Sequence, residues 1–300
     1  MTLLRPRSFR RFHLLHALLL SSFAGSLPLV ARTSGIEISH QAADTRTQQP
    51  EADTEIWAAF LGWLKGAPPL GGPLEALQGF EQSTVTAGAT SDEAKRRVVV
   101  VRRLMSERGD WWPLMFDRIY ASERPAFNQN PSTVLVEAIE GRRPGRALDV
   151  AMGQGRNALF LAQRGWSVTG FDVSNEGLSV ARASAKKAGV PLEAVNRSFE
   201  DFPYGTAQWD LIALIYVPAA AHEGAAMTRL ARALKPGGLL VIESFASDRD
   251  AQQRRPVDID PAELKKALSE FDIVRFDDGQ AVSEWDPQPT RLCRVIARKR

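Results

Sequence analysis

The sequence predicts an α/β fold in which a doubly wound, mostly parallel sheet follows a small N-terminal helical cap. With 300 residues, of which 44% are hydrophobic and 24% charged, the chain can bury a sizeable core. From Arg146 onward, short apolar runs alternate with helical patterns, which is the order expected of a parallel sheet covered by helices on both faces. These apolar runs are continuous rather than alternating, as is typical of strands buried on both sides.

We expect the α/β domain to cover residues 132–300. Its strands are predicted at residues 147–150, 167–172, 192–195, 210–217, 239–243, 272–276 and 292–297. Its helices are predicted at residues 132–140, 156–164, 176–188, about 222–234 and 261–270.

A helical cap is expected over residues 55–131. Apolar side chains recur at helical spacing in residues 56–64. A second helix is predicted from a Ser91 cap to Gly109, and a third covers residues 111–120. The basic side chains of the second helix are interpreted as a solvated face.

The first 31 residues have the pattern of a signal peptide, or of a membrane anchor if the segment is not cleaved. An arginine cluster precedes residues 12–31, which carry no formal charge. We therefore expect an exported or membrane-anchored protein that contacts a membrane only through residues 12–31. The alternative is an over-extended gene start, in which case the protein is cytoplasmic. Residues 32–54 are polar without an apolar period, which predicts a flexible linker.

The positive charge of the chain belongs to this leader. The first 36 residues hold five of the 38 basic side chains and no acid, so the remainder carries 33 basic and 35 acidic side chains, a net charge of −2. This balance gives no electrostatic case for nucleic acid binding and favours a small-molecule substrate. One cysteine and four scattered histidines argue against a metal site or a disulfide framework. The oligomeric state is left open.

The first predicted strand of the domain runs into a glycine loop that suits a nucleotide-like cofactor. Gly153 and Gly155 let the backbone pass close under a ligand, and the helix beginning at Arg156 presents free N–H groups. Asp172 ends the second strand, where a carboxylate without an obvious structural partner can accept both ribose hydroxyls. Asp149 precedes the glycines, where it would repel a pyrophosphate but could engage a cationic amino group.

Four segments together resemble the motifs of class I S-adenosylmethionine-dependent methyltransferases. They are Leu148-Asp149-Val150-Ala151-Met152-Gly153-Gln154-Gly155-Arg156-Asn157, Gly170-Phe171-Asp172, Trp209-Asp210-Leu211-Ile212 and Leu234-Lys235-Pro236-Gly237-Gly238. The resemblance covers about residues 112–300 and is most similar to the tellurite-resistance and thiopurine methyltransferase branch. It implies S-adenosylmethionine as cofactor and a Rossmann-like sheet of seven strands, the last inserted antiparallel. Ala151 departs from the family, which usually has a glycine there; alanine permits the turn where φ is negative.

The resemblance also assigns nine residues to the cofactor. They are Asp149, Gly153, Gly155 and Arg156 for the methionine part, Asp172 for the ribose, Ser198, Phe199 and Glu200 for the adenine, and Tyr120 as an aromatic residue that closes over the cofactor. Three of these have an alternative interpretation. Arg156 could be solvated, Tyr120 could be a core anchor, and either Glu200 or its neighbour Asp201 could be only a turn cap.

Methyl transfer from a sulfonium needs in-line approach and exclusion of water more than acid or base groups. Tyr216, at the end of the fourth strand, is the candidate lining the methyl group, and His222 is a possible base. The alternative for His222 is a polar residue that opens a surface helix. Because no convincing general base accompanies them, we expect a soft nucleophile, a thiol or a chalcogen species, as the acceptor.

Two other functions remain open at this stage. One is an NAD(P)-dependent oxidoreductase, which Asp149 disfavours and for which no catalytic Tyr-x-x-x-Lys pattern is evident. The other is a non-catalytic exported binding protein, since S-adenosylmethionine is made in the cytosol and an exported copy would lack its cofactor.

Overall fold

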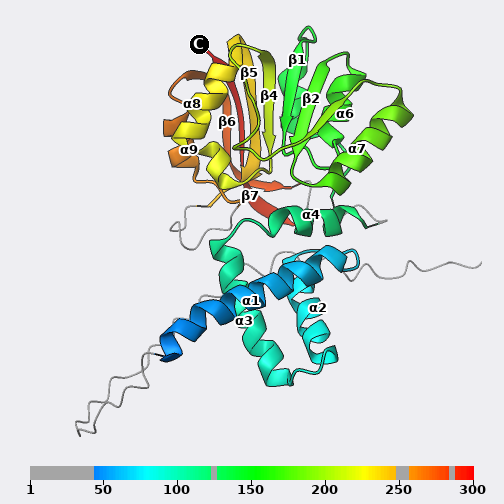
Figure 1. Ribbon diagram of the computed structural model, residues 1–300. Coiled ribbons are helices and arrows are strands. Elements are labelled where there is room, and N and C mark those ends of the chain that lie inside the picture. The colour runs from blue at the N-terminus through cyan, green and yellow to red at the C-terminus, as the bar shows by residue number, and fades with distance from the viewer. Residues whose placement is uncertain (1–43, 123–126, 248–256, 284–287) are drawn as a thin grey trace, which may run out of the picture. The chain divides into compact units, whose positions relative to one another are not determined.

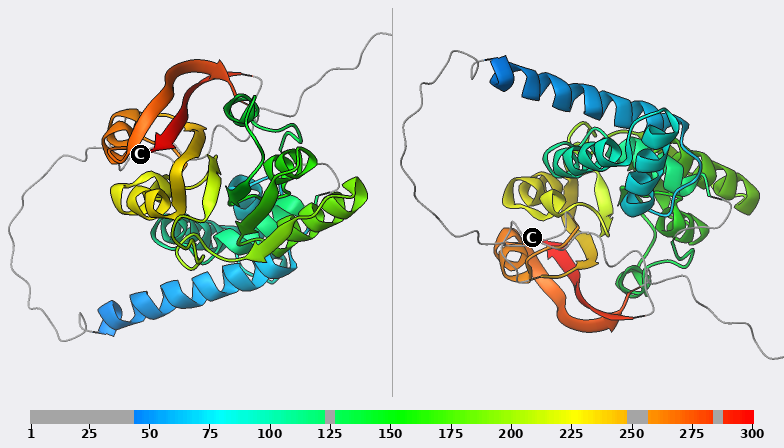
Figure 2. Two further views of the ribbon diagram at one scale, coloured as in Figure 1. Left: turned by 90° about the horizontal axis from the view of Figure 1, so that it is seen from above. Right: turned by 90° about the horizontal axis from the view of Figure 1, so that it is seen from below.

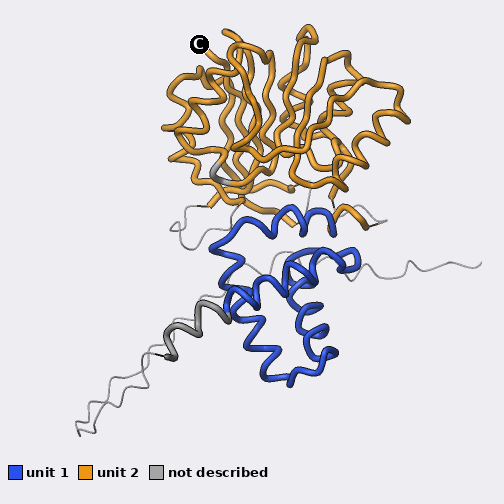
Figure 3. Tube along the Cα trace, viewed as in Figure 1, with its two compact units in different colours: residues 1–118 blue, residues 119–300 orange. Residues whose placement is uncertain are grey.

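The computed structural model describes residues 44–122, 127–247, 257–283 and 288–300 (Figure 1). The predicted leader, residues 1–31, lies outside these ranges, as do residues 32–43. None of the helices in the described ranges combines the length and the hydropathy that a membrane crossing requires. Internal contacts divide the chain into two units, Met1–Arg118 and Ile119–Arg300 (Figure 3), and each is described by itself.

The first unit is helical and is held together by aromatic packing. Its helices are α1 (Asp44–Gly66), α2 (Pro73–Thr86), α3 (Ser91–Glu107) and the larger part of α4 (Trp112–Tyr120). The fully buried Phe60 of α1 packs its ring 5.5 Å from that of Trp57 and 5.4 Å from that of Phe80 in α2. Gly79 lets α2 approach α1 closely, because a Cβ there would lie 2.7 Å from the Trp63 ring.

The structure corrects three expectations in this unit. Helix α1 begins at Asp44, inside the predicted linker, although this first part of the helix has no apolar period. Helix α2 was not predicted. The cap of α3 is Thr90 rather than Ser91, since the Thr90 side chain accepts a hydrogen bond from the Glu93 N–H at 3.3 Å.

The second unit is built on a seven-stranded sheet with the order β3-β2-β1-β4-β5-β7-β6. Its strands are β1 (Arg146–Val150), β2 (Ser167–Asp172), β3 (Glu193–Asn196), β4 (Trp209–Ile215), β5 (Leu234–Phe245), β6 (Phe271–Val282) and β7 (Pro289–Lys299). β7 runs antiparallel to both of its neighbours, β5 and β6, and the other pairs are parallel. Figure 2 shows β6 and β7, orange to red, side by side at one edge of this sheet.

Helices cover both faces of the sheet, each over its own apolar core. One core receives side chains from α5 (Thr133–Ile139), α6 (Arg156–Gln163) and α7 (Asn175–Ala188). The other receives side chains from α8 (Gly224–Ala233) and α9 (Pro261–Ala267). The short 3-10 helix η1 (Ala219–His222) follows β4.

The predicted fold class is confirmed, including the antiparallel last strand. The bounds of β2 agree with the prediction, whereas β5 and β6 are longer than predicted. β5 begins at Leu234 and so includes Pro236 and Gly237, with a register shift between its pairings with Trp209 and Leu211. β6 is mostly exposed, so its second half lacks the apolar run that marks a buried strand.

Removal of residues 1–50 is expected to leave the fold intact. Among the side chains that the structure describes, the buried ones of α1 begin at Trp57, and the ion pair between Asp53 and Arg103 is retained. We expect the shortened protein to unfold cooperatively, with Tm within about 2 °C of the full chain. Circular dichroism of both proteins tests this; a shortened chain that is insoluble or loses its cooperative transition would contradict it.

Candidate functional site

The topology places one candidate site at the carboxyl ends of β1, β2 and β4. From β1 the chain continues to β2 and β3 on one side, whereas β4 and β5 lie on the other. Ligands of open α/β sheets bind at such a reversal of strand order, outside the carboxyl ends of the strands. The predicted residues Asp149, Asp172 and Tyr216 lie at or next to the carboxyl ends of three adjacent strands.

The loop after β1 turns tightly into α6. Gly153 and Gly155 have φ angles of 54° and 80°, in the left-handed region that favours glycine. A Cβ at residue 153 would overlap the hydroxyl of Tyr120, and one at residue 155 would lie 2.9 Å from the Cβ of Ala181. Side chains are therefore excluded at both positions, which allows Tyr120 and Ala181 to pack closely against the backbone of the loop.

Ala151 departs from expectation. Alanine would permit the turn without strain where φ is negative, but the φ of Ala151 is 51°. The residue therefore adopts the conformation that favours glycine, as in the family that the sequence resembles, and carries left-handed strain that glycine would not.

Asp172 is buried and orients the loop. Its Oδ2 accepts a hydrogen bond from the Gly153 N–H and its Oδ1 accepts one from the Ser174 N–H, both at 2.8 Å. The expectation that this carboxylate lacks a structural partner was thus wrong. Because each carboxylate oxygen can accept more than one hydrogen bond, Asp172 can hold the loop and still accept hydroxyl groups of a ligand.

Asp149 is the most unusual group in the site. Its side chain is 1% exposed, and its Oδ2 has no hydrogen-bond partner within the part of the chain that the structure describes. Burial raises the pKa of Asp149 to about 7, although the charge of Arg156 and the hydrogen bond from the Ala158 N–H act to lower it. A buried carboxylate with an unpaired oxygen at the end of β1 is a site for a cation or a hydrogen-bond donor.

Arg156 and Tyr120 also lie at the glycine loop. Arg156 Nη1 donates to the Asn130 carbonyl at 2.9 Å, which joins α6 to the segment before α5. The ring of Tyr120 packs against Gly153 and Gly177 and lies 5.8 Å from that of Phe127. Burial raises the pKa of the Tyr120 phenol well above its ordinary value, and the charge of Asp172 adds to this shift.

The predicted adenine residues form a turn after β3. Ser198 Oγ donates to Asp201 Oδ2 at 2.9 Å and accepts from the Asp201 N–H at 3.2 Å. Asp201 is thus the residue that closes this turn, and Glu200 is left exposed. Phe199 is half-buried, with its ring 5.6 Å from that of Tyr204.

Tyr216 follows β4, and its hydroxyl is already engaged. The side chain is buried and donates to Glu243 Oε1 at 3.0 Å. Its backbone has a φ of 55°, in the left-handed region.

His222 ends η1 and is buried, not on a surface helix. The sequence reasoning missed Glu243, whose signal was a single acid within the otherwise apolar run of β5.

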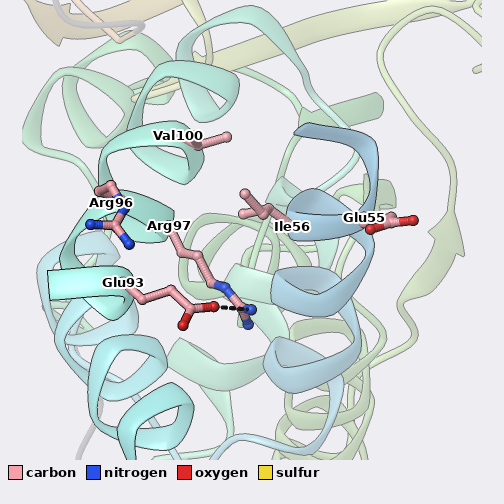
Figure 4. A pocket seen from close by; sticks show the side chains of 6 residues that line it. All are labelled: Glu55, Ile56, Glu93, Arg96, Arg97 and Val100. Atoms are coloured by element: carbon pink, nitrogen blue, oxygen red, sulfur yellow. Dashed lines mark hydrogen bonds and ion pairs between the residues drawn. The ribbon is translucent and has the colours of Figure 1, made fainter. Parts of the chain in front are cut away.

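A hollow lies in the helical unit, between α1 and α3 (Figure 4). It has a volume of about 270 Å3 and is lined by Glu55, Ile56, Glu93, Arg96, Arg97 and Val100. Arg97 and Glu93 pair within it at 2.6 Å. The lining has no nucleophile and no histidine, so we place no chemistry there. Within the described ranges, no three His, Cys, Asp or Glu side chains are grouped as metal ligands would be.

Residues 147–238 match the family model described as a methyltransferase domain. An uncharacterized protein of Mycobacterium tuberculosis is 26% identical over 67% of this chain and 80% of its own length. The ubiquinone biosynthesis O-methyltransferase of Vibrio atlanticus is 30% identical over 43% of this chain and 54% of its own length. The S-adenosyl-L-methionine-dependent Diels-Alderase iccD of Talaromyces variabilis is 33% identical over 37% of this chain and 40% of its own length.

Among solved structures, TehB from Haemophilus influenzae superposes with a TM-score of 0.50 at 16% identity, over 62% of this chain and 66% of TehB. At this identity the likeness shows a shared fold and leaves the branch within the family a prediction.

Replacing Asp149 by Asn is expected to change how stability depends on pH. In the folded protein this carboxyl keeps its proton up to about pH 7, whereas in the unfolded chain it ionises near its ordinary pKa. The unfolded state therefore binds fewer protons, and Asp149 makes the wild type less stable as pH rises from about 4 to 7. The Tm difference, Asp149→Asn minus wild type, should rise between about pH 5 and 7 and then level off. The corresponding change in the free energy of unfolding over these pH units is on the order of 3 kcal/mol.

The matched control is Asp210→Asn, at the opposite end of the sheet. Burial acts to raise the pKa of Asp210, but its hydrogen bonds with Lys235 and the Arg146 N–H outweigh burial and lower it. Its Tm difference from wild type should be flat over the same pH range. A flat curve for Asp149→Asn as well would show that this carboxyl is ionised throughout.

Proposed function

We infer that this protein binds S-adenosylmethionine at the carboxyl ends of β1 and β2 and transfers its methyl group to a small acceptor. The match of residues 147–238 to a methyltransferase domain supports this inference. The observation that carries the proposal is the unpaired Oδ2 of the buried Asp149. The amino acid part of S-adenosylmethionine carries an ammonium group, which would satisfy this oxygen and favour the ionised carboxylate.

The same carboxylate disfavours a dinucleotide. A pyrophosphate bound against the glycine loop and the N-terminus of α6 would bring its negative charges close to Asp149. The loop thus combines the glycine backbone common to nucleotide sites with an electrostatic preference for a cationic ligand. We therefore favour S-adenosylmethionine over NAD(P).

The remaining site residues would bind and orient the cofactor. We propose that Asp172 accepts the ribose hydroxyls while it holds the Gly153 N–H, and that Ser198, Phe199 and Glu200 border the adenine. Tyr120, packed over the loop, would exclude water from the sulfonium side. The cofactor itself supplies an electrophilic methyl group when bound, so the protein's task is orientation of the acceptor.

The acceptor is proposed to be a soft nucleophile such as a thiol or a reduced chalcogen species. The Tyr216 hydroxyl donates its proton toward Glu243, which makes Tyr216 a poor proton acceptor. His222 would be the remaining candidate base. An acceptor that needs little deprotonation at neutral pH fits such a site best.

S-adenosylhomocysteine is expected to bind with micromolar affinity, and NAD should bind at least about tenfold more weakly. Asp172→Ala should weaken S-adenosylhomocysteine by at least about tenfold, because both the ribose contacts and the two backbone N–H contacts are lost. Isothermal calorimetry measures each affinity. Asp210→Ala removes a carboxylate that also accepts a backbone N–H but lies at the other end of β4, and it should leave the affinity unchanged. NAD binding more tightly than S-adenosylhomocysteine would overturn the proposal.

Methyl transfer is expected for aromatic thiols, and for selenite or tellurite with a thiol reductant, and it should be slow for catechols. A panel of these acceptors with transfer RNA and a protein lysate, assayed with radiolabelled S-adenosylmethionine, distinguishes the classes. Turnover confined to RNA or protein would contradict a small acceptor, and rapid catechol methylation would contradict a soft one. Cofactor binding without any methyl transfer would favour a reaction other than methylation. The Talaromyces relative, which is named a Diels-Alderase, is an example of such a reaction.

A further inference from the structure

Glu243 is a completely buried carboxylate near the carboxyl end of β5. It accepts hydrogen bonds from three different elements. Ser132 Oγ, just before α5, donates at 2.5 Å, Tyr216 Oη after β4 at 3.0 Å, and Arg294 Nε in β7 at 3.0 Å. A buried carboxylate is tolerated only with such partners, so these side chains form one interdependent cluster.

The cluster holds a strained residue in place. Tyr216 has a left-handed backbone, with φ 55°, which is rare for a bulky side chain and persists only where the surroundings enforce it. Glu243 contacts Tyr216 twice, since its carboxylate accepts from the phenol and its backbone carbonyl accepts from the Tyr216 N–H at 2.7 Å. Glu243 of β5 thus holds both the backbone and the phenol group of Tyr216.

Tyr216 lies next to the candidate site, so the contacts with Glu243 that hold it also affect the shape of that site. Leu214 of β4 pairs with Val150, the last residue of β1, so Tyr216 lies just beyond the edge at which the glycine loop begins. The left-handed turn at Tyr216 sets the direction in which the chain leaves β4. It therefore sets the wall that faces the proposed methyl group.

The Glu243 cluster also contacts the helix that follows the glycine loop, through Ser132. The Ser132 N–H donates to Asn157 Oδ1 at 2.9 Å, and Asn157 lies in the first turn of α6. Ser132 therefore joins Glu243 to the start of the helix that follows the loop.

We propose that Glu243 is a positioning residue, which holds Tyr216 in its left-handed conformation and thereby fixes the acceptor wall at the end of β4. This inference rests on the proposed function, because the wall matters only if an acceptor approaches it. Glu243 touches neither the cofactor nor the acceptor in this account and acts through Tyr216.

The first test reads the conformation of Tyr216 without any activity. The chain has only three tyrosines, so 3-fluorotyrosine labelling gives three fluorine resonances, which single Tyr→Phe substitutions assign. Glu243→Gln and Ser132→Ala should shift or broaden the Tyr216 resonance and leave that of Tyr204 in place. Ser244→Ala is the control, since it removes a buried serine hydroxyl whose bond goes to the Val257 carbonyl. An unchanged Tyr216 resonance in both cluster variants would overturn the proposal.

The second test separates positioning from loss of folded protein. With an aromatic thiol as acceptor, Glu243→Gln and Tyr216→Phe should raise the acceptor KM at least about tenfold, with the affinity for S-adenosylhomocysteine within about twofold of wild type. A loss of folded protein would instead lower kcat and leave KM unchanged, and that result would count against positioning. If wild type bound no S-adenosylhomocysteine, the proposed function would fail, whereas the fluorine spectra would still decide whether Glu243 holds Tyr216.

Discussion

The burial of Asp149 is the constraint on which the candidate site depends. Its carboxyl group is buried near the end of β1, and its Oδ2 has no hydrogen-bond partner among the described residues. Burial raises the pKa of Asp149 to about 7, although the charge of Arg156 and the Ala158 N–H act against this shift. A buried carboxyl oxygen without a partner costs free energy, and under the proposed function the ammonium group of the ligand would offset that cost.

Two of the three non-glycine residues with a left-handed φ in the described ranges lie close to this edge of the sheet. Ala151 after β1 and Tyr216 after β4 both have left-handed φ angles, 51° and 55°, and the two strands are neighbours in the sheet. Strained backbone that clusters at one edge indicates a site whose geometry is maintained by its surroundings. For Tyr216 those surroundings are identifiable as Glu243 and its donors Ser132 and Arg294. Under the proposed function, the cofactor side would be fixed by the glycine loop and the acceptor side by the buried carboxylate cluster.

The sequence predicted the parts of this arrangement that depend on local pattern. Continuous apolar runs located the strands, and the bounds of β2 were predicted to the residue. Asp149 and Asp172 were placed correctly at strand ends because a charge after a buried run is a local signal. The partners of Asp172, the sign of φ at Ala151 and the role of Glu243 depend on residues far apart in the chain. Ser132 and Glu243 are 111 positions apart, and no local pattern encodes that contact.

The most direct test of this account is the affinity for S-adenosylhomocysteine as a function of pH. If its ammonium group pairs with Asp149, binding requires the ionised carboxylate, and the affinity should rise about tenfold per pH unit up to about pH 7 and then level off. In Asp149→Asn the affinity should be weaker at pH 8 and nearly independent of pH. An affinity that is the same in both proteins at every pH would contradict the pairing on which the account rests.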